Sequence, residues 1–324
     1  MNREQWLKDR KKGIGGSDAA AVLGLNPYSS ALAVYLDKIG EGEPVEENER
    51  MGWGLKLEKL IVAEYETRTG MRVVHNTEQS ISIHPVHDWM CCTLDAVAYP
   101  LDDPKNGGVL QAKNVDRFMK HEWEDRVPEH YLIQLMHEIA VTGLKWGALV
   151  VLIGGNEWRS YEFDRDEDLI SLIIEKESAF WHENVLKRIP PDPTGASLEV
   201  LGRMYKQDNG KSITLYDDAI GKAITSYLDA KAHLDRYTKQ KEDSEAIIKS
   251  AMGDAAQGIY QAGDTTFGIS WSSVKGRVGF DAKTFEQENP ELYKKYVKTG
   301  ASYRRFMVKE KKAAIGQTKL KEVA

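Results

Sequence analysis

Two apolar runs separated by a loop of turn-forming residues are the feature that most constrains the fold of this chain. The runs are Met90–Tyr99 and Val109–Val115, and the nine residues between them include two prolines and two glycines. This pattern predicts two antiparallel strands joined by a hairpin loop. Because side chains alternate between the faces of a strand, Gln111 and Lys113 should share one face, and the neighbouring strand can bring Asp95 beside them.

The polar cluster of Asp95, Gln111 and Lys113 suggests a chemistry. Carboxylate and amide oxygens are hard ligands that suit Mg²⁺ or Mn²⁺, and these ions can accept a phosphate oxygen alongside their waters. A nearby lysine can orient or help to deprotonate a bound water, or offset charge that builds up on a phosphoryl group. The cluster therefore suits metal-dependent cleavage of a phosphodiester, although such a trio taken alone is more often an ordinary solvated hairpin.

A second candidate element lies near the N-terminus, in residues 6–24. Ser17 and Asp18 precede the apolar-rich run Ala19–Leu23 and are expected to cap a helix there. The free amides at the start of that helix, with Arg10 upstream, could hold a phosphate group. The alternative is a capped helix that binds no ligand.

Two predicted helices carry further candidates. Glu58 lies in a run whose apolar spacing is helical, where most glutamates are simply solvated. Gln134 lies on a helix that is expected to begin at Pro128, and a glutamine on a half-buried helix usually satisfies backbone groups. Tyr131 and His137 on the same helix are weaker candidates for a place in the site.

Taken together and in this order, these segments resemble the motifs of the PD-(D/E)xK nuclease superfamily. Within it the chain is similar to the YqaJ viral recombinase family and to the phage-lambda-type alkaline exonucleases. The matching segments are Trp6–Gly24, Gly52–Glu58, the hairpin with Asp95, Gln111 and Lys113, and Val127–His137. The resemblance covers residues 1–190 and implies an α/β (α+β) fold, a restriction-endonuclease-like core with a mixed central sheet flanked by helices.

The resemblance also implies a role for each candidate. The implied catalytic residues are Glu58, Asp95, Gln111 and Lys113. The implied ligands of Mg²⁺, for which Mn²⁺ can substitute, are Glu58, Asp95, Gln111 and the backbone carbonyl of Ala112. The residues implied to bind the DNA terminus and its 5′-phosphate are Arg10, Ser17, Thr93 and Gln134. Thr93 is expected two residues before Asp95 on the same strand face.

Gln111 departs from the family pattern, which most often has a glutamate at this position. The amide still offers an oxygen, but the change removes one negative charge from the metal shell. The departure therefore bears on how tightly a second ion is held. Because Glu58, Asp95 and Lys113 all remain, we expect an active enzyme.

The activity implied by the resemblance is a Mg²⁺-dependent exonuclease that enters at a double-stranded DNA end, degrades the 5′-ended strand and leaves a 3′ single-stranded overhang. The resemblance also implies a ring-shaped homo-oligomer, a trimer in the lambda-type enzymes, and a partner protein that anneals the exposed strand during recombination. Two alternatives stay open. One is a structure-specific or restriction-type endonuclease, because the superfamily shares the core motif, and the other is a non-catalytic scaffold that binds DNA ends.

Charge and composition limit how the chain can bind DNA. A net charge of −6 over 324 residues argues against electrostatic wrapping, so binding should depend on local basic patches and metal-bridged phosphates. The chain has no long apolar span or signal-like N-terminus, which predicts a cytoplasmic protein of a bacterial host cell that does not enter a membrane. Cys91 and Cys92 are expected to be a reduced thiol pair.

Prolines near residue 190 predict a boundary between a nuclease domain, residues 1–190, and a C-terminal extension, residues 191–324. Near the end of the first domain, residues 149–163 predict another strand pair that completes the sheet. Residues 166–185 then predict an amphipathic helix.

The extension differs in character from the first domain. Residues 217–256 predict one long helix or a helical hairpin, and residues 258–271 predict strands around a Gly-Asp turn. The tail, residues 294–324, has ten Lys or Arg against two Glu, with aromatic residues between them. Such a tail suits single-stranded DNA or an acidic partner surface, and it is equally compatible with plain solvation.

Overall fold

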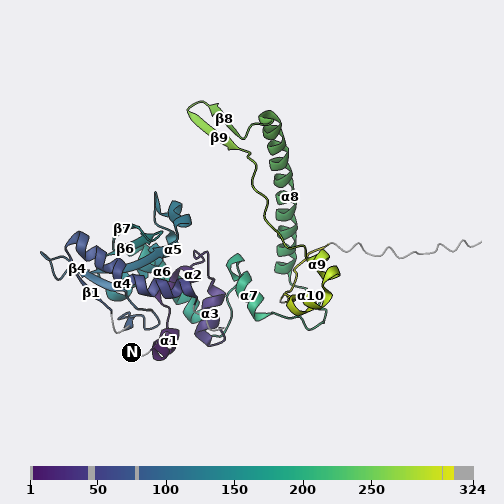
Figure 1. Ribbon diagram of the computed structural model, residues 1–324. Helices are drawn as coiled ribbons and strands as arrows, with labels where there is room; N and C mark the ends of the chain where they lie inside the picture. The colour runs from purple at the N-terminus through teal and green to yellow at the C-terminus, as the bar shows by residue number, and fades with distance from the viewer. Residues whose placement is uncertain (1–2, 43–47, 77–79, 301, 310–324) are drawn as a thin grey trace, which may run out of the picture. The chain divides into compact units, whose positions relative to one another are not determined.

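The structure is a computed structural model that describes residues 3–42, 48–76, 80–300 and 302–309 (Figure 1). The chain divides into two compact units, Met1–Tyr205 and Lys206–Ala324. The first unit contains every candidate site residue. The second unit corresponds to most of the predicted C-terminal extension.

A five-stranded mixed sheet forms the centre of the first unit. The described part of the first unit contains the strands β1 (Arg72–His75), β2 (Ser82–Ile83), β3 (Cys91–Cys92), β4 (Ala96–Tyr99), β5 (Gly108–Val115), β6 (Trp146–Ile153) and β7 (Glu157–Asp164). The order in the main sheet is β1-β4-β5-β6-β7, and β2 pairs with β3 in a small second sheet. β5 and β6 are parallel, and the other neighbouring pairs are antiparallel.

Helices cover both faces of the main sheet. The α-helices of the first unit are α1 (Arg3–Asp9), α2 (Gly16–Val22), α3 (Ala31–Ile39), α4 (Glu49–Thr69), α5 (Glu129–Thr142), α6 (Glu167–Ala179) and α7 (Leu198–Met204). The shorter helical segments are the 3₁₀ turns η1 (Arg10–Lys12), η2 (Arg117–Trp123) and η4 (Gly195–Ser197), and a π-helical turn, η3 (Phe180–Val185).

The core is divided between the two faces. Val109 on β5 belongs to an apolar cluster with α2, α3, α5 and α6, whereas Leu110 belongs to a second cluster with α4. Successive strand residues point to opposite faces, so α4 covers one face and α5 covers the other. This arrangement confirms the predicted fold class, a mixed sheet flanked by helices.

The predicted hairpin is confirmed, but its first strand is interrupted. β4 and β5 pair antiparallel, with Ala96 opposite Leu110. The predicted strand Met90–Tyr99 breaks between β3 and β4, so neither Thr93 nor Asp95 lies on a strand. Two contacts with residues distant in sequence accompany the break, because the Asn76 side chain donates to the Leu94 carbonyl and the Asp95 carboxylate accepts from the backbone N–H of Ala112.

The first unit continues past the predicted boundary at residue 190. The prolines do follow the end of the helical run formed by α6 and η3, as expected. However, the chain then packs back onto the first unit, where Ser197 is buried and Leu201 contacts the core. The compact unit therefore ends at Tyr205.

The second unit contains one long helix rather than a helical hairpin. Its elements are α8 (Asp218–Met252), β8 (Gln257–Ala262), β9 (Thr265–Ser270), α9 (Ala282–Glu288) and α10 (Pro290–Tyr296). β8 and β9 pair around the predicted Gly263-Asp264 turn, where Gly263 has a φ of 58° that favours glycine. Residues 310–324 of the basic tail lie outside the described residues.

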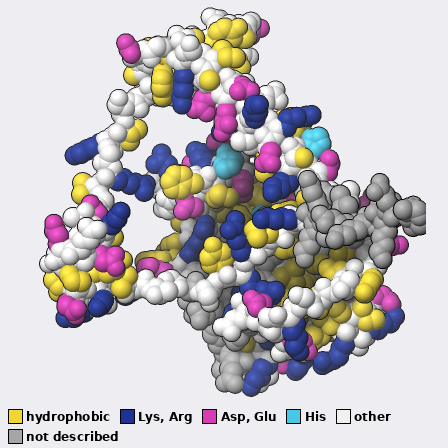
Figure 2. All heavy atoms as spheres, turned by 90° about the vertical axis from the view of Figure 1, so that its right-hand side faces the viewer, with side chains coloured by type: hydrophobic (Ala, Val, Ile, Leu, Met, Phe, Trp, Pro, Cys, Tyr) yellow, Lys and Arg dark blue, Asp and Glu magenta, His cyan; other side chains and the backbone are white. Residues whose placement is uncertain are grey.

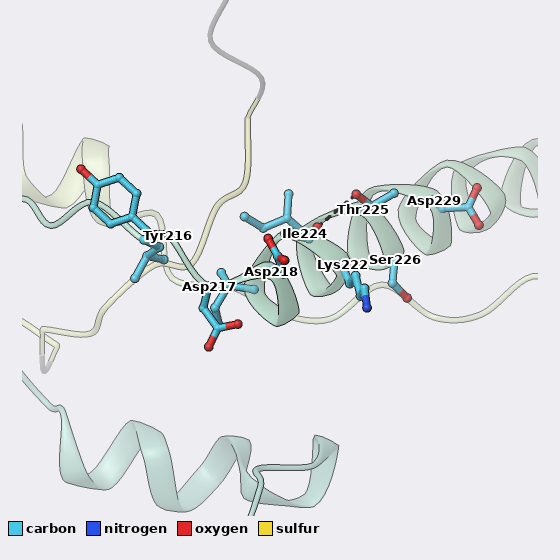
Figure 3. A pocket seen from close by; sticks show the side chains of 11 residues that line it. Tyr216, Asp217, Asp218, Lys222, Ile224, Thr225, Ser226 and Asp229 are labelled. Carbon is cyan, nitrogen blue, oxygen red and sulfur yellow. Dashed lines mark hydrogen bonds between the residues drawn. The ribbon is translucent and has the colours of Figure 1, made fainter.

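Figure 3 shows a surface hollow around the start of α8, lined in part by Tyr216, Asp217, Ile224 and Asp229. All of its lining residues are exposed, so it is an open depression and not an enclosed cavity. Asp217 already caps α8 by accepting the backbone N–H of Ala219. The hollow contains none of the candidate site residues.

Candidate active site

Asp95 occupies the loop between β3 and β4, where β5 passes beside it. One of its oxygens, Oδ2, accepts two hydrogen bonds, from Gln111 Nε2 at 2.7 Å and from the backbone N–H of Ala112 at 2.8 Å. Burial raises the pKa of Asp95, while the nearby Lys113 ammonium and the Ala112 N–H oppose that rise. The predicted proximity of Asp95 to β5 is therefore confirmed, although Asp95 is in a loop.

Gln111 contributes an amide whose two ends have different surroundings. The side chain is 5% exposed, and its nitrogen is held by the Asp95 carboxylate, which can accept only from an N–H. Its oxygen, Oε1, is buried and accepts no hydrogen bond from any part of the chain that the structure describes. An unpartnered buried carbonyl oxygen is costly, so Oε1 suits a ligand that the protein binds.

Lys113 lies two residues further along β5, on the same side of the strand as Gln111. Its Nζ donates to Gln134 Oε1 at 3.0 Å and lies 5.0 Å from the centre of the Tyr131 ring. Burial lowers the pKa of Lys113, and the nearby carboxylates of Asp95, Glu138 and then Glu58 oppose the change. The ammonium is therefore easier to deprotonate than an ordinary surface lysine.

Glu58 supplies a second carboxyl group from α4. Burial raises the pKa of Glu58 to about 7, and the negative charge of Asp95 adds to the rise, whereas Lys113 lowers it. Because the charge of Asp95 hinders the ionisation of Glu58, a cation between the two carboxyl groups would be favourable. The predicted placement of Glu58 on a helix beside Asp95 and Lys113 is thus consistent with the structure.

These donors fit a hard divalent cation. In residues 3–42, 48–76, 80–300 and 302–309, no group of three His, Cys, Asp or Glu could hold a metal ion. The possible set at this site is instead two carboxylates, Glu58 and Asp95, with the unpartnered amide oxygen of Gln111. The backbone N–H of Ala112 points toward Asp95. Because the N–H and C=O of one strand residue point to the same edge of the strand, the Ala112 carbonyl lies on the Asp95 side of β5 as well.

Three of the four residues implied to bind the DNA terminus and its 5′-phosphate lie in one cluster, which two hydrogen bonds and one cation–π contact hold together. Arg10 Nη2 donates to Ser17 Oγ at 3.1 Å, and the Arg10 guanidinium lies 5.0 Å from the centre of the Trp6 ring. The indole N–H of Trp6 donates to Thr93 Oγ1 at 3.0 Å. Thr93 is two residues from Asp95, so the cluster is next to the carboxylate group.

Ser17 does not cap α2, contrary to the sequence-based expectation. The N-cap is Gly15, and Asp18, the third residue of the helix, accepts the Gly15 backbone N–H at 3.0 Å. Asp18 also binds the buried Lys38 ammonium at 2.7 Å. Ser17 is therefore exposed at the helix start, with its hydroxyl directed to Arg10.

Glu138 is a site residue that the sequence did not reveal. Gln134 Nε2 donates to Glu138 Oε1 at 3.0 Å, and Glu138 is 1% exposed. Burial raises the pKa of Glu138 to about 8, and Asp95 adds to the rise. The sequence did contain one signal for this residue, namely a glutamate one turn after Gln134 within an apolar helical run. A glutamate in such a run is buried only if it has polar partners.

His137 faces away from this group. Its Nε2 lies 2.9 Å from the Cys91 carbonyl, to which it donates, and its Nδ1 lies 2.8 Å from Glu177 Oε1. Both His137 and Glu177 are fully buried, and the charge of Glu177 raises the pKa of His137 against the effect of burial. The pair joins α5 to α6, which makes it a structural contact. Cys91 and Cys92 are both buried and free, as expected.

The surface carries both signs of charge. On the face seen in Figure 2, Lys and Arg side chains are interspersed with Asp and Glu. This distribution agrees with the net charge of −6 and with binding at local sites. Across the described ranges, no helix has both the length and the apolar character needed to span a membrane.

The chain is similar to several known proteins. The family model of the YqaJ-like viral recombinase domain matches residues 5–145. The uncharacterized protein YqaJ of Bacillus subtilis (strain 168) is 33% identical over 321 residues, which cover 96% of this chain and 95% of that protein. Two similar solved structures are an alkaline exonuclease (LHK-Exo) from Laribacter hongkongensis and a phage related exonuclease from Haemophilus somnus 129PT.

The first of these structures is 19% identical, with a TM-score of 0.45, and the match covers 62% of this chain and 97% of that chain. The second is 12% identical, with a TM-score of 0.43, and the match covers 55% of this chain and 96% of that chain. The identity with Bacillus subtilis YqaJ extends over nearly the whole of both chains. This chain therefore belongs to the YqaJ-like viral recombinase family.

Proposed function

We propose that this protein is a divalent-metal-dependent deoxyribonuclease that works from the ends of double-stranded DNA. The observation that carries the proposal is the pair of contacts around β5. Asp95 and Gln111 form one pair and leave the Gln111 oxygen unpartnered, while Lys113 and Gln134 form the other. Glu58 adds the second carboxyl group. Membership of a viral recombinase family supports the same class of activity.

Each residue has a role in this proposal. Glu58, Asp95 and the Gln111 oxygen would hold Mg²⁺ or Mn²⁺, with the Ala112 carbonyl on the same side. The ion would supply Lewis acidity at the scissile phosphate. Lys113 would face the attacking water, where its lowered pKa lets it accept a proton and its charge can offset the negative charge of the transition state.

The cluster that contains Arg10 supports a proposal for the polarity of degradation. Arginine binds a phosphate through two parallel charge-assisted hydrogen bonds, and the hydroxyls of Ser17 and Thr93 add donors that suit the remaining oxygens. Because Thr93 adjoins Asp95, a terminal 5′-phosphate bound here would place the adjoining linkage near the carboxylates. We therefore propose 5′-to-3′ degradation that leaves a 3′ overhang.

Incubation of linear and covalently closed circular duplexes with Mg²⁺ tests the proposal. We expect the linear duplex alone to be consumed, and the Asp95→Ala variant to lose at least about a thousandfold in rate because it lacks a metal ligand. Cutting of both substrates would support a structure-specific or restriction-type endonuclease. Binding of linear ends without any cleavage would support a non-catalytic scaffold.

The same proposal extends to assembly and partners. A ring-shaped homo-oligomer would keep the enzyme on one DNA strand. Light scattering coupled to size-exclusion chromatography tests whether the full chain forms such an oligomer, with a trimer as the expected state. A single-strand annealing protein would take up the 3′ overhang, and co-elution with the full chain tests that association. A monomer that degrades only a few nucleotides per encounter would contradict the ring.

A further inference from the structure

Glu138 is an unusual residue for the middle of α5. The helix residues around it, such as Leu135 and Ile139, are fully buried in the apolar core. A carboxyl group in such surroundings destabilises the fold unless its hydrogen bonds repay the lost hydration. Glu138 makes one such bond, from Gln134 Nε2 at 3.0 Å, and its Oε2 is buried without a partner among the described residues.

The bond to Glu138 determines which way the Gln134 amide faces. Glu138 Oε1 accepts from the Gln134 nitrogen, and this contact leaves Gln134 Oε1 to face Lys113. Gln134 Oε1 accepts from Lys113 Nζ at 3.0 Å. Rotation of the amide by half a turn would break both of these hydrogen bonds and would place its N–H₂ against the Lys113 ammonium, where both groups can only donate.

The packing of α2 confines this pair of side chains. A Cβ atom added at Gly16 would lie 2.7 Å from Glu138 Oε1, 3.0 Å from Glu138 Cγ and 3.3 Å from Gln134 Cγ. These distances leave no space for an alanine unless the pair moves. The first turn of α2 therefore fixes the two side chains in place, and the same turn presents Ser17 to Arg10.

We propose that Glu138 is a positioning residue that acts through Gln134 to orient Lys113, an inference that rests on the nuclease function proposed above. The side-chain hydrogen bond of Glu138 is to Gln134 and not to Lys113. Its carboxyl group sets the orientation of the amide, and the amide oxygen then fixes where the ammonium lies beside the Asp95 and Gln111 pair.

Three variants of the full chain test this inference. The assays are run at pH 9, above the pKa of Glu138 of about 8, where the wild-type group is a carboxylate that can only accept. In Glu138→Gln the residue beside Gln134 offers an N–H₂ as well as an oxygen, so the amide at 134 can turn. We expect kcat on a 5′-phosphorylated linear duplex to fall about 10- to 100-fold, as for other residues that orient an active-site group, with KM little changed. Gln134→Glu alone places two carboxyl groups together, and we expect a similar loss.

The exchange variant, Gln134→Glu with Glu138→Gln, is the decisive case. Here the carboxylate at 134 can accept from Lys113 with one oxygen and from the amide at 138 with the other, so the chain of contacts is rebuilt with the groups reversed. We expect kcat to recover to within about tenfold of wild type, as the restored contact predicts. The exchange keeps the same atoms in the same space, so it also provides a folded comparison if Glu138→Gln is unstable.

Glu177→Gln is the matched control, because Glu177 is an equally buried glutamate that binds His137 and takes no part in the site. Its kcat should equal that of wild type. Wild-type kcat in Glu138→Gln, or an exchange variant no more active than the single variants, would overturn the positioning role. Failure of the proposed function looks different, since the wild-type chain would then not cleave or Asp95→Ala would cleave normally.

Discussion

The raised pKa of Glu58 makes metal binding depend on pH in a way that can be worked out from the structure. In the chain without metal, burial and the neighbouring Asp95 hold the pKa of Glu58 at about 7. A cation binds the ionised carboxylate, so binding must remove the proton that Glu58 carries at lower pH. Affinity for Mg²⁺ should therefore rise with pH across this range and level off above it.

The magnitude follows from the ionised fraction. With a pKa of about 7, about nine tenths of the Glu58 carboxyl groups are ionised at pH 8 and about one tenth at pH 6. The apparent Kd for Mg²⁺ should therefore be about tenfold larger at pH 6 than at pH 8, which corresponds to about 1.4 kcal/mol of binding free energy. The raised pKa of Asp95 acts in the same direction.

Titration calorimetry of the full chain with Mg²⁺ at pH 6, 7 and 8 measures this dependence. Parallel titrations in buffers with different ionisation enthalpies count the protons released, and we expect close to one proton per ion near pH 6. Glu58→Gln is the control, because its amide holds no proton to release. An apparent Kd that is constant between pH 6 and 8, or an unchanged slope in Glu58→Gln, would refute the reasoning.

Three further predictions concern other parts of the chain. Gln111→Glu loses the hydrogen bond to Asp95 and sets two carboxyl groups side by side. In EDTA this should lower the free energy of unfolding by about 1–3 kcal/mol and lower the thermal midpoint. Addition of Mg²⁺ should then raise the midpoint of the variant more than that of wild type. Arg10→Ala should slow degradation of 5′-phosphorylated ends at least about tenfold more than that of 5′-hydroxyl ends, because the lost contact is a charge-assisted bond to phosphate. Truncation after Tyr205 should leave a folded nuclease in thermal melts and linear-duplex assays, whereas truncation after Pro193 should lower the melting temperature because it removes the buried Ser197.

Each of these predictions has its own contradicting result. A folded but inactive Gln111→Glu protein would mean that the neutral amide has another role, such as donating to DNA. Equal slowing of both kinds of end by Arg10→Ala would make Arg10 a structural residue. An insoluble truncation after Tyr205 would show that the second unit is needed to stabilise the first.

Local patterns in the sequence predicted the elements of the site well. The β4–β5 hairpin follows from two apolar runs and a proline- and glycine-rich loop, and the helical position of Glu58 follows from apolar spacing. Resemblance to a family supplied the roles of Arg10 and Thr93, and the structure brings both to Trp6. The contact through Trp6 was not predicted, because Trp6 and Thr93 are 87 positions apart.

Features that depend on distant residues were missed for the same reason. The break at Asp95 requires the amide of Ala112 and the side chain of Asn76, which no local pattern near Asp95 contains. The burial of Glu138 depends on α2, where the absence of a side chain at Gly16 makes space for it. Propensity and periodicity report neighbours along the chain, and these contacts are made across the fold.

The parallel pairing of β5 with β6 also determines when the site can form during synthesis of the chain. Antiparallel strands can close through a short loop, but a parallel pair needs a crossover, and here that crossover contains α5. Lys113 therefore meets Gln134 only after α5 has left the ribosome and docked on the sheet. A nascent chain that ends before β6 has the β4–β5 hairpin without its parallel neighbour. The β4–β5 hairpin alone therefore cannot supply the complete site, which also needs the chain as far as α5.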